Sequence, residues 1–418
     1  MKKAELIVYT DILVTCAGDG KPKTGPELKN AGLIRNAAVV ANKGIIEFAG
    51  NREDADAQYQ PAEDAVVIEA GSKPVLPGFV DSHTHPVFAG NRVNEFILRA
   101  RGATYQEIHA AGGGIQHTVD RTREATDDEL YAKTKTVLMR MLRHGSTTVE
   151  AKSGYGLETE EEIRELRILR KLSGEVPVNM TTTFLGAHAI PREYADRRGE
   201  FIKLLTEEMM PLVKKENLAD FVDAFCEEGA FTPEETRQIL ESARQQGFRL
   251  KLHAEEFTNQ GSARMAGQLG AVSVDHLLRL NDEDIDSLAK TDTILTLMPG
   301  TLFNLNIKEY ANARKMIEKG AKVALATDYN AGSCMSESMQ MAVSLGCIKM
   351  AMSPDEALNA ATYNASFAVC LNDKVGSIEP GKLADMVIYD IDDYRLIPYH
   401  FGVNLAETVI KSGKIIRF

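Results

Sequence analysis

Apolar and polar positions alternate differently at the two ends of the 418-residue chain than in its middle. Near both ends, short apolar runs are separated by turns that contain glycine, as in "LIVYTDILVTC" and "TVIKSGKIIRF". Runs of this kind predict β-strands joined by turns. We therefore expect residues 1–75 and 371–418 to form one small, β-sandwich-like domain that is built from both termini.

Residues 76–370 show a different pattern, in which strand-like apolar runs alternate with segments of helical period. One such segment, residues 127–145, places six side chains on a single helix face: Leu130, Thr134, Val137, Leu138, Met141 and Leu142. Two more helices are predicted to begin after Thr232 and Ser353. Each of these residues is followed by a proline and, at the third position, by a glutamate, which is the pattern of a capping box.

Eight strand-like runs separate the helical segments of this middle region. They cover residues 75–85, 145–153, 178–188, 219–229, 248–256, 271–276, 293–300 and 322–330. Eight β/α units over about 300 residues predict an α/β fold with a closed (β/α)8 barrel, the TIM-like architecture, rather than an open sheet.

Composition and charge argue against some classes of binding partner and indicate the cellular setting. The formal net charge of −12 disfavours binding to nucleic acid and to anionic membranes. No apolar run reaches about 18 residues, the length that a membrane-spanning helix needs. The five cysteines are scattered and never spaced as CxxC, which argues against a disulfide framework and favours a reducing, cytoplasmic setting.

Several of the nine histidines fall at the ends of predicted strands. His83 and His85 end the first strand and, at positions i and i+2, project from the same face. Later strands contribute His188, His253, His276 and Asp328. In a parallel barrel the carboxyl ends of all strands meet at one mouth, where such folds place their active sites. Three histidines and one aspartate suit zinc or iron and leave a coordination position open for water.

Three motifs, "PGFVDSHTH", "LKLHAEE" and "ALATDYNAGS", resemble those of the metal-dependent amidohydrolase superfamily, and "GSIEPGKLADMVIYD" is similar to part of its usual small β-domain. The segments "HTHPVFAGNR", "AKSGYGL", "TFLGAH" and "LHAEEF" narrow the resemblance, which extends over essentially the whole chain, to the imidazolonepropionase family. This resemblance implies a hydrolase of histidine degradation. Such an enzyme uses a metal-activated water to open the cyclic amide of 4-imidazolone-5-propanoate, which gives N-formimidoyl-L-glutamate.

The resemblance also implies roles for individual residues. It assigns one zinc or iron ion per subunit to four ligands, His83, His85, His253 and Asp328. It makes Glu256 the general base and His276 a neighbouring residue that orients or polarises the reacting groups. It implies a homodimer and six substrate contacts, namely Arg92, Tyr155, His188, Asn330, Gly332 and Ser333, with Tyr105 as a weaker candidate.

Physical arguments from the residues themselves support some of these roles. An anionic substrate meets an unfavourable field in a chain of charge −12, so it needs a local cation. Arg92 supplies one, because a guanidinium can hold a carboxylate tail through two parallel hydrogen bonds. Some members of the superfamily that the chain resembles bridge two metals with a lysine of the fourth strand. Here that strand ends in Glu227 and Glu228 without such a lysine, so the resemblance implies a single metal ion, and we expect two solvated glutamates. Whether Glu227 or the loop at Gly112–Gly114 takes part in the site stays open.

Two other classes of function also stay open at this point. A deaminase of a nitrogen heterocycle, or a hydantoinase-like ring opener, would share the metal ligands and differ only in the residues that line the pocket. A non-catalytic scaffold protein would carry substitutions at the ligand positions, and none is visible in the sequence.

Overall fold

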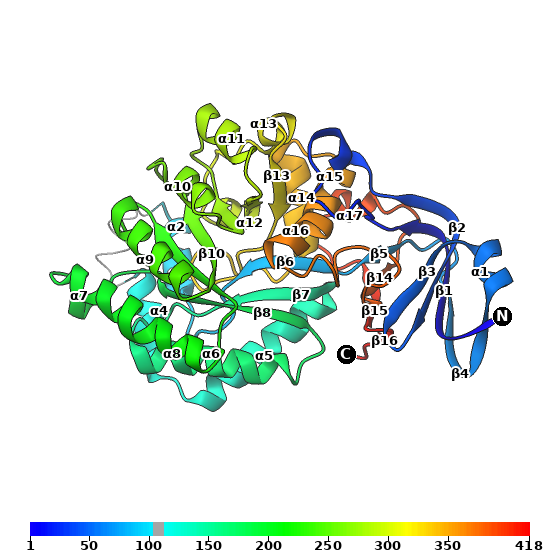
Figure 1. Cartoon of the computed structure of the whole chain (residues 1–418), viewed down its shortest axis with the longest axis horizontal. Coiled ribbons are helices and arrows are strands. Elements are labelled where there is room, and N and C mark those ends of the chain that lie inside the picture. The colour runs from blue at the N-terminus through cyan, green and yellow to red at the C-terminus, as the bar shows by residue number, and fades with distance from the viewer. Residues whose placement is uncertain (103–112) are drawn as a thin grey trace.

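The structure is a computed structural model that describes residues 1–102 and 113–418. Two sheets organise the chain, a parallel barrel from its middle and a mixed sheet from its two ends (Figure 1). Tyr105 and Gly112, which sequence analysis associated with the pocket, lie outside the described residues. Among the described residues, no helix is both long enough and apolar enough to cross a membrane.

Eight strands form the barrel in chain order, and every neighbouring pair among them is parallel. They are β6 (Phe79–Thr84), β7 (Ser146–Lys152), β8 (Asn179–Ala187), β9 (Phe221–Cys226), β10 (Arg249–Ala254), β11 (Ser273–His276), β12 (Ile294–Leu297) and β13 (Lys322–Leu325). The segment that follows β13 closes the barrel against β6, because Thr84 and Tyr329 form a parallel bridge there. The predicted TIM-like barrel is confirmed.

Helices connect successive strands and surround the barrel (Figure 1). They are α2 (Val93–Ala100), α4 (Ile115–Glu124), α5 (Asp127–Arg143), α6 (Thr159–Ser173), α7 (Arg198–Lys203), α8 (Met210–Lys215), α9 (Pro233–Gln245), α10 (Ser262–Gln268), α11 (Asp282–Leu288), α12 (Pro299–Asn304), α13 (Ala313–Glu318), α14 (Met339–Met350), α15 (Pro354–Ala361) and α16 (Tyr363–Ala368), with the short helical segments η2 (Arg192–Tyr194) and η3 (Leu204–Met209). The six side chains predicted on one face of residues 127–145 are all buried in α5. The capping boxes predicted at Thr232 and Ser353 are both present, at the starts of α9 and α15.

The two ends of the chain share one sheet beside the barrel (Figure 1). Its strands are β1 (Lys2–Val14), β2 (Leu33–Asn42), β3 (Ile45–Asn51), β4 (Tyr59–Glu69), β5 (Val75–Pro77), β14 (Met386–Tyr389), β15 (Ala406–Lys411) and β16 (Lys414–Ile415), accompanied by η1 (Gly25–Lys29), α1 (Arg52–Gln58) and α17 (Leu396–Tyr399). The antiparallel pairing of β14 with β5 joins the two ends. Both termini therefore build the small β-domain, while the boundaries at 75/76 and 370/371 stay predictions.

Candidate active site

Four side chains from distant parts of the sequence converge at the carboxyl-terminal mouth of the barrel. His83 lies on β6, His85 directly follows that strand, His253 lies on β10, and Asp328 follows β13. The Nε2 atom of His85 lies 3.3 Å from the Nε2 atoms of both His83 and His253. Asp328 Oδ1 lies 3.6 Å from His83 Nε2 and 3.4 Å from His85 Nε2. The structure thus brings together, all buried, the four residues that sequence analysis grouped as metal ligands.

Two buried aspartates determine which ring nitrogen of these histidines faces the cluster. Asp275 Oδ2, on β11, accepts a hydrogen bond of 2.6 Å from His83 Nδ1, and Asp223 Oδ2, on β9, lies 3.0 Å from His253 Nδ1. Burial raises the pKa of Asp223, but His253 and the Lys152 ammonium outweigh it and hold this pKa well below its usual range. Burial, opposed by the Lys251 and Lys152 ammonium groups, raises the pKa of Asp275. In its carboxylate form each aspartate only accepts hydrogen bonds, so we assign the proton of both rings to Nδ1, which leaves a lone pair on Nε2.

The four donor groups fit a divalent metal ion. Burial lowers the pKa of His83 and that of His85 well below the usual value, so both rings are neutral. Lone pairs and a carboxylate that face one another at these distances repel unless a cation lies between them. Imidazole nitrogens and a carboxylate oxygen are the donors that zinc and iron prefer. The Thr301 hydroxyl donates to the second oxygen of Asp328 at 2.6 Å, which orients that carboxylate as well.

Charged side chains also fill the barrel interior next to the cluster, and sequence analysis did not identify them. Lys152 Nζ lies 2.7 Å from Glu150 Oε1 and 2.8 Å from Asp223 Oδ2, and Lys251 Nζ donates to two backbone carbonyls. All of these side chains, and Asp275, are fully buried. The lysines compensate the carboxylates that orient the histidines. These buried charges could have been suspected from the sequence, because charged residues interrupt the otherwise apolar strands at these positions.

Glu256 and His276 lie next to the four donors. Glu256 Oε1 is 3.6 Å from His276 Nδ1, and both side chains are buried. Burial, together with the carboxylates of Asp328 and Glu227, raises the pKa of Glu256 well above its usual value. Burial lowers the pKa of His276 to about 3. Buried carboxyl groups whose pKa is raised in this way are typical of acid–base groups at reaction centres.

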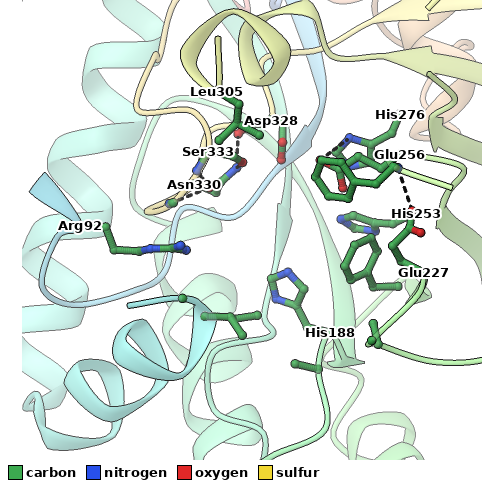
Figure 2. Close-up of a pocket in the computed structure, with 18 of the residues that line it drawn as sticks. Arg92, His188, Glu227, His253, Glu256, His276, Leu305, Asp328, Asn330 and Ser333 are labelled. Atoms are coloured by element: carbon green, nitrogen blue, oxygen red, sulfur yellow. Dashed lines mark hydrogen bonds and ion pairs between the residues drawn. The ribbon is translucent and has the colours of Figure 1, made fainter. Parts of the chain in front are cut away.

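A cavity of about 830 Å³ opens beside the cluster, and its two walls differ in charge (Figure 2). Figure 2 shows Glu227, Glu256 and His276 on one side and Arg92 on the other. The cavity lining includes the six main substrate contacts that sequence analysis proposed, namely Arg92, Tyr155, His188, Asn330, Gly332 and Ser333.

Arg92 is held in one orientation by its neighbours. Its Nε and Nη2 atoms donate to the two carboxylate oxygens of Glu95, at 2.7 and 2.6 Å. A Cβ atom at Gly332 would lie only 2.0 Å from Arg92 Nη1, so a side chain there would displace the guanidinium from its present position. Sequence analysis proposed Arg92 as a local cation for the substrate tail and did not name Glu95 as its partner. The ion pair could have been predicted from the i,i+3 spacing of Arg92 and Glu95.

The loop after β7 presents Tyr155 to the cavity next to His188. The ring centroids of these two residues are 5.3 Å apart, and the His188 ring stacks on that of His85 at 5.0 Å. His188 Nδ1 lies 2.9 Å from the Gly154 carbonyl oxygen, to which it can donate. The two aromatic groups therefore extend from the histidine cluster along the cavity.

Two buried glutamates of α6 hold this loop in place. Glu165 accepts hydrogen bonds from the amides of Gly154 and Tyr155, at 3.0 and 3.4 Å. Glu162 accepts hydrogen bonds from the amides of the next two residues, at 3.0 and 2.8 Å. Burial, followed by the charge of Glu162, raises the pKa of Glu165 well above its usual value.

Asn330 organises the loop that follows β13. Its Oδ1 atom accepts the amides of Gly332 and Ser333, while its Nδ2 atom donates to the Asp328 carbonyl and to the Ser333 hydroxyl. These contacts use all four hydrogen-bonding positions of the side-chain amide. Asn330 thus shapes the loop that carries Gly332 and Ser333 to the cavity, and its contact with substrate stays a prediction.

Glu227 is buried, and the prediction that it is solvated is wrong. It accepts hydrogen bonds from the amides of Phe257 and Thr258, at 2.8 and 3.3 Å. These contacts stabilise the turn after Glu256. No local sequence pattern could predict them, because Phe257 and Thr258 lie about thirty residues from Glu227 along the chain. Glu228 is exposed, as expected.

Known proteins are similar to this chain in sequence and in fold. A sequence model described as the Amidohydrolase family matches residues 75–416. The imidazolonepropionase of Alkaliphilus oremlandii is 47% identical over 405 residues, which cover 97% of this chain and 96% of that protein. The imidazolonepropionase of Brevibacillus brevis is 44% identical over 418 residues, which cover 100% and 98%.

A solved structure agrees at the level of the fold. The crystal structure of an adenosine deaminase from Xanthomonas campestris with bound zinc has a TM-score of 0.69 and 17% identity, and the match covers 99% of this chain and 93% of that one. The family assignment rests on the two relatives above, because they are similar over nearly their whole length. The chain belongs to the imidazolonepropionase family, within the amidohydrolases.

Proposed function

We propose that this enzyme hydrolyses the cyclic amide C–N bond of 4-imidazolone-5-propanoate and releases N-formimidoyl-L-glutamate, a step of histidine degradation. One observation carries the proposal. A cluster of metal donors and Glu256 lie on one side of a single cavity, and the cation Arg92 lies on the other (Figure 2). A substrate with a reactive ring at one end and a carboxylate tail at the other matches this arrangement.

One metal ion, zinc or iron, would be held by His83, His85, His253 and Asp328. When bound, it lowers the pKa of a coordinated water and polarises the carbonyl group of the substrate. The protein prepares the donors for this task, because Asp275 and Asp223 orient the histidine lone pairs. Zinc and iron share this preference for nitrogen and oxygen donors, so metal analysis of the purified protein is the deciding measurement.

Glu256 would carry the proton that hydrolysis must move. The water oxygen bonds to the ring carbonyl carbon, and its proton passes to Glu256. The bond between that carbon and the ring nitrogen then breaks, and Glu256 returns the proton to the departing nitrogen. Glu256 Oε1 lies 3.6 Å from His276 Nδ1, so His276 would orient Glu256 or polarise the carbonyl oxygen.

The remaining cavity residues would position the substrate. Arg92 would bind the propanoate tail, since Glu95 already fixes the plane of its guanidinium. Tyr155 and His188 would contact the ring, and the loop that carries Gly332 and Ser333, shaped by Asn330, would approach it through backbone groups.

Two assays test this function. The metal-loaded protein should consume 4-imidazolone-5-propanoate, and Glu256→Gln should lower kcat about 10²- to 10⁴-fold while the metal content stays unchanged. Glu228→Gln is the matched control, because Glu228 also lines the cavity but is exposed, and it should keep normal turnover. Near-normal turnover of Glu256→Gln would reject the role of Glu256 as base.

Rival functions would give different results in the same experiments. Release of ammonia from a panel of purines and pyrimidines, without turnover of the imidazolone, would identify a deaminase. Absence of bound metal, with no gain after zinc or iron is added, would favour a non-catalytic scaffold. We further propose a cytoplasmic homodimer, for which light scattering of the purified protein tests the assembly.

A further inference from the structure

The first turns of α2 direct a group of charged side chains toward the cavity. Arg92, Glu95 and Arg99 are separated by three and four residues, so they share one face of this helix. All three line the cavity. Arg99 is the member of this group that neither the motifs nor the proposed mechanism uses.

Arg99 differs from Arg92 in its partners. Both carboxylate oxygens of Glu95 accept hydrogen bonds from Arg92, and one of them also accepts a hydrogen bond of 2.9 Å from the Gly114 amide. Within residues 1–102 and 113–418, Arg99 forms no ion pair, and its buried Nε atom has no hydrogen-bond partner. Its one hydrogen bond there is a long one, from Nη2 to the Gly332 carbonyl oxygen at 3.4 Å. This guanidinium is therefore able to accept a new anionic partner.

Both guanidinium groups meet at one residue of the loop after β13. Arg92 packs directly on Gly332, and Arg99 reaches the carbonyl of the same residue. Counting only described residues, the two guanidiniums and the single carboxylate of Glu95 leave one positive charge on this wall of the cavity. A half-buried charge without a counter-ion is costly, and burial together with Arg92 accordingly lowers the pKa of Arg99.

We infer that Arg99 is a second carboxylate-binding residue, which holds the tail of the substrate together with Arg92. The inference rests on the proposed function, because the tail is that of the proposed substrate. Glu95 acts as a positioning residue that orients Arg92 and cancels one charge, so the wall is matched to a single carboxylate. Glu227 and Glu256 line the opposite side of the cavity, away from the two guanidiniums (Figure 2).

Binding of two probes to the metal-loaded protein tests this role. The probes are 3-(imidazol-4-yl)propanoate and its uncharged amide, and calorimetry measures both dissociation constants. Arg99→Gln should weaken binding of the propanoate about tenfold to a hundredfold, the range of a hydrogen bond to a charged group, and leave binding of the amide unchanged. Arg99→Lys should recover part of the loss, because it keeps the charge without the planar fork.

Arg101→Gln is the matched control, because Arg101 is exposed at the end of the same helix. This variant should bind both probes as tightly as the wild type does. Equal weakening of both probes in Arg99→Gln would overturn the inference and make Arg99 a support of the cavity wall. Unchanged binding of both probes, or a wild type that does not prefer the propanoate, would overturn it too. If the wild type prefers the propanoate and Arg99→Gln abolishes this preference, but 4-imidazolone-5-propanoate is not turned over, the proposed function fails and the carboxylate site stands.

Discussion

Replacing Asp275 by asparagine tests how the protein prepares His83 to bind a metal ion. The substitution keeps the size of the side chain but removes the charge that accepts the hydrogen bond from His83 Nδ1 at 2.6 Å. The new amide group can also donate to Nδ1, which moves the ring proton to Nε2 and removes the lone pair that faces the other donors. Both changes weaken the same metal ligand.

The magnitude follows from the burial and the charge of this pair. Both side chains are fully buried, so water cannot replace the lost contact. A hydrogen bond to a charged group contributes about 1.5–3 kcal/mol, and about 1.4 kcal/mol is a factor of ten in affinity. We therefore expect the metal affinity of Asp275→Asn to fall about tenfold to a hundredfold, in the range found for groups that orient metal-binding histidines.

Equilibrium competition with a chromophoric chelator measures this metal affinity directly. Asp284→Asn is the matched control, because Asp284 is also buried but contacts Asn259 and Arg264 instead of a histidine. Unchanged metal affinity in Asp275→Asn would refute the assigned position of the His83 proton. An equal loss in both variants would show a general loss of stability rather than an effect on His83.

Three further changes test other parts of the molecule. Glu165→Ala leaves the buried amides of Gly154 and Tyr155 without their acceptor, so unfolding free energy should fall by about 1–3 kcal/mol and KM should rise; an unchanged KM would restrict Glu165 to folding. Burial, followed by the charge of Arg140, lowers the pKa of Lys133 from 10.5 to about 8. Between these values the unfolded chain binds more protons than the folded one, so the unfolding free energy of the wild type relative to Lys133→Met should rise with pH through this window in urea titrations. A constant difference would contradict the lowered pKa. Removal of the metal ion by a chelator should lower Tm, because binding adds about 4 kcal/mol to folding when free metal is a thousand times its Kd; scanning calorimetry with and without added zinc checks this, and an unchanged Tm would contradict a metal held between strands.

Much of the fold could be predicted from local sequence patterns. The six buried positions of α5 and the capping boxes at Thr232 and Ser353 follow from helical period and from hydrogen bonds within one turn. The order of eight strands and the helices between them is likewise visible along the chain, because each β/α unit is built from neighbouring segments. Such features depend on residues that are close in sequence.

Barrel geometry grouped the candidate residues at the mouth from sequence, and the resemblance to the amidohydrolases selected four of them as metal ligands. His83, His253 and Asp328 are far apart along the chain, but each stands at the carboxyl end of a strand-like run, and parallel strands bring those ends to one mouth. Arg99 could also have been found, since it lies seven residues after Arg92 on the same helix face. Glu227 could not, because its partners come from the turn after another strand.

The sequence by itself thus determined the alternation of strands and helices, the sharing of a small sheet by both termini, and the set of residues at the mouth of the barrel. Only the tertiary structure decided which buried acid faces which histidine, that Lys152 joins Asp223 to Glu150, and that two guanidiniums meet at Gly332. The reason is physical. Periodicity records which side of an element is buried, whereas the choice between several buried charges as partners depends on distances across the barrel that no local pattern contains.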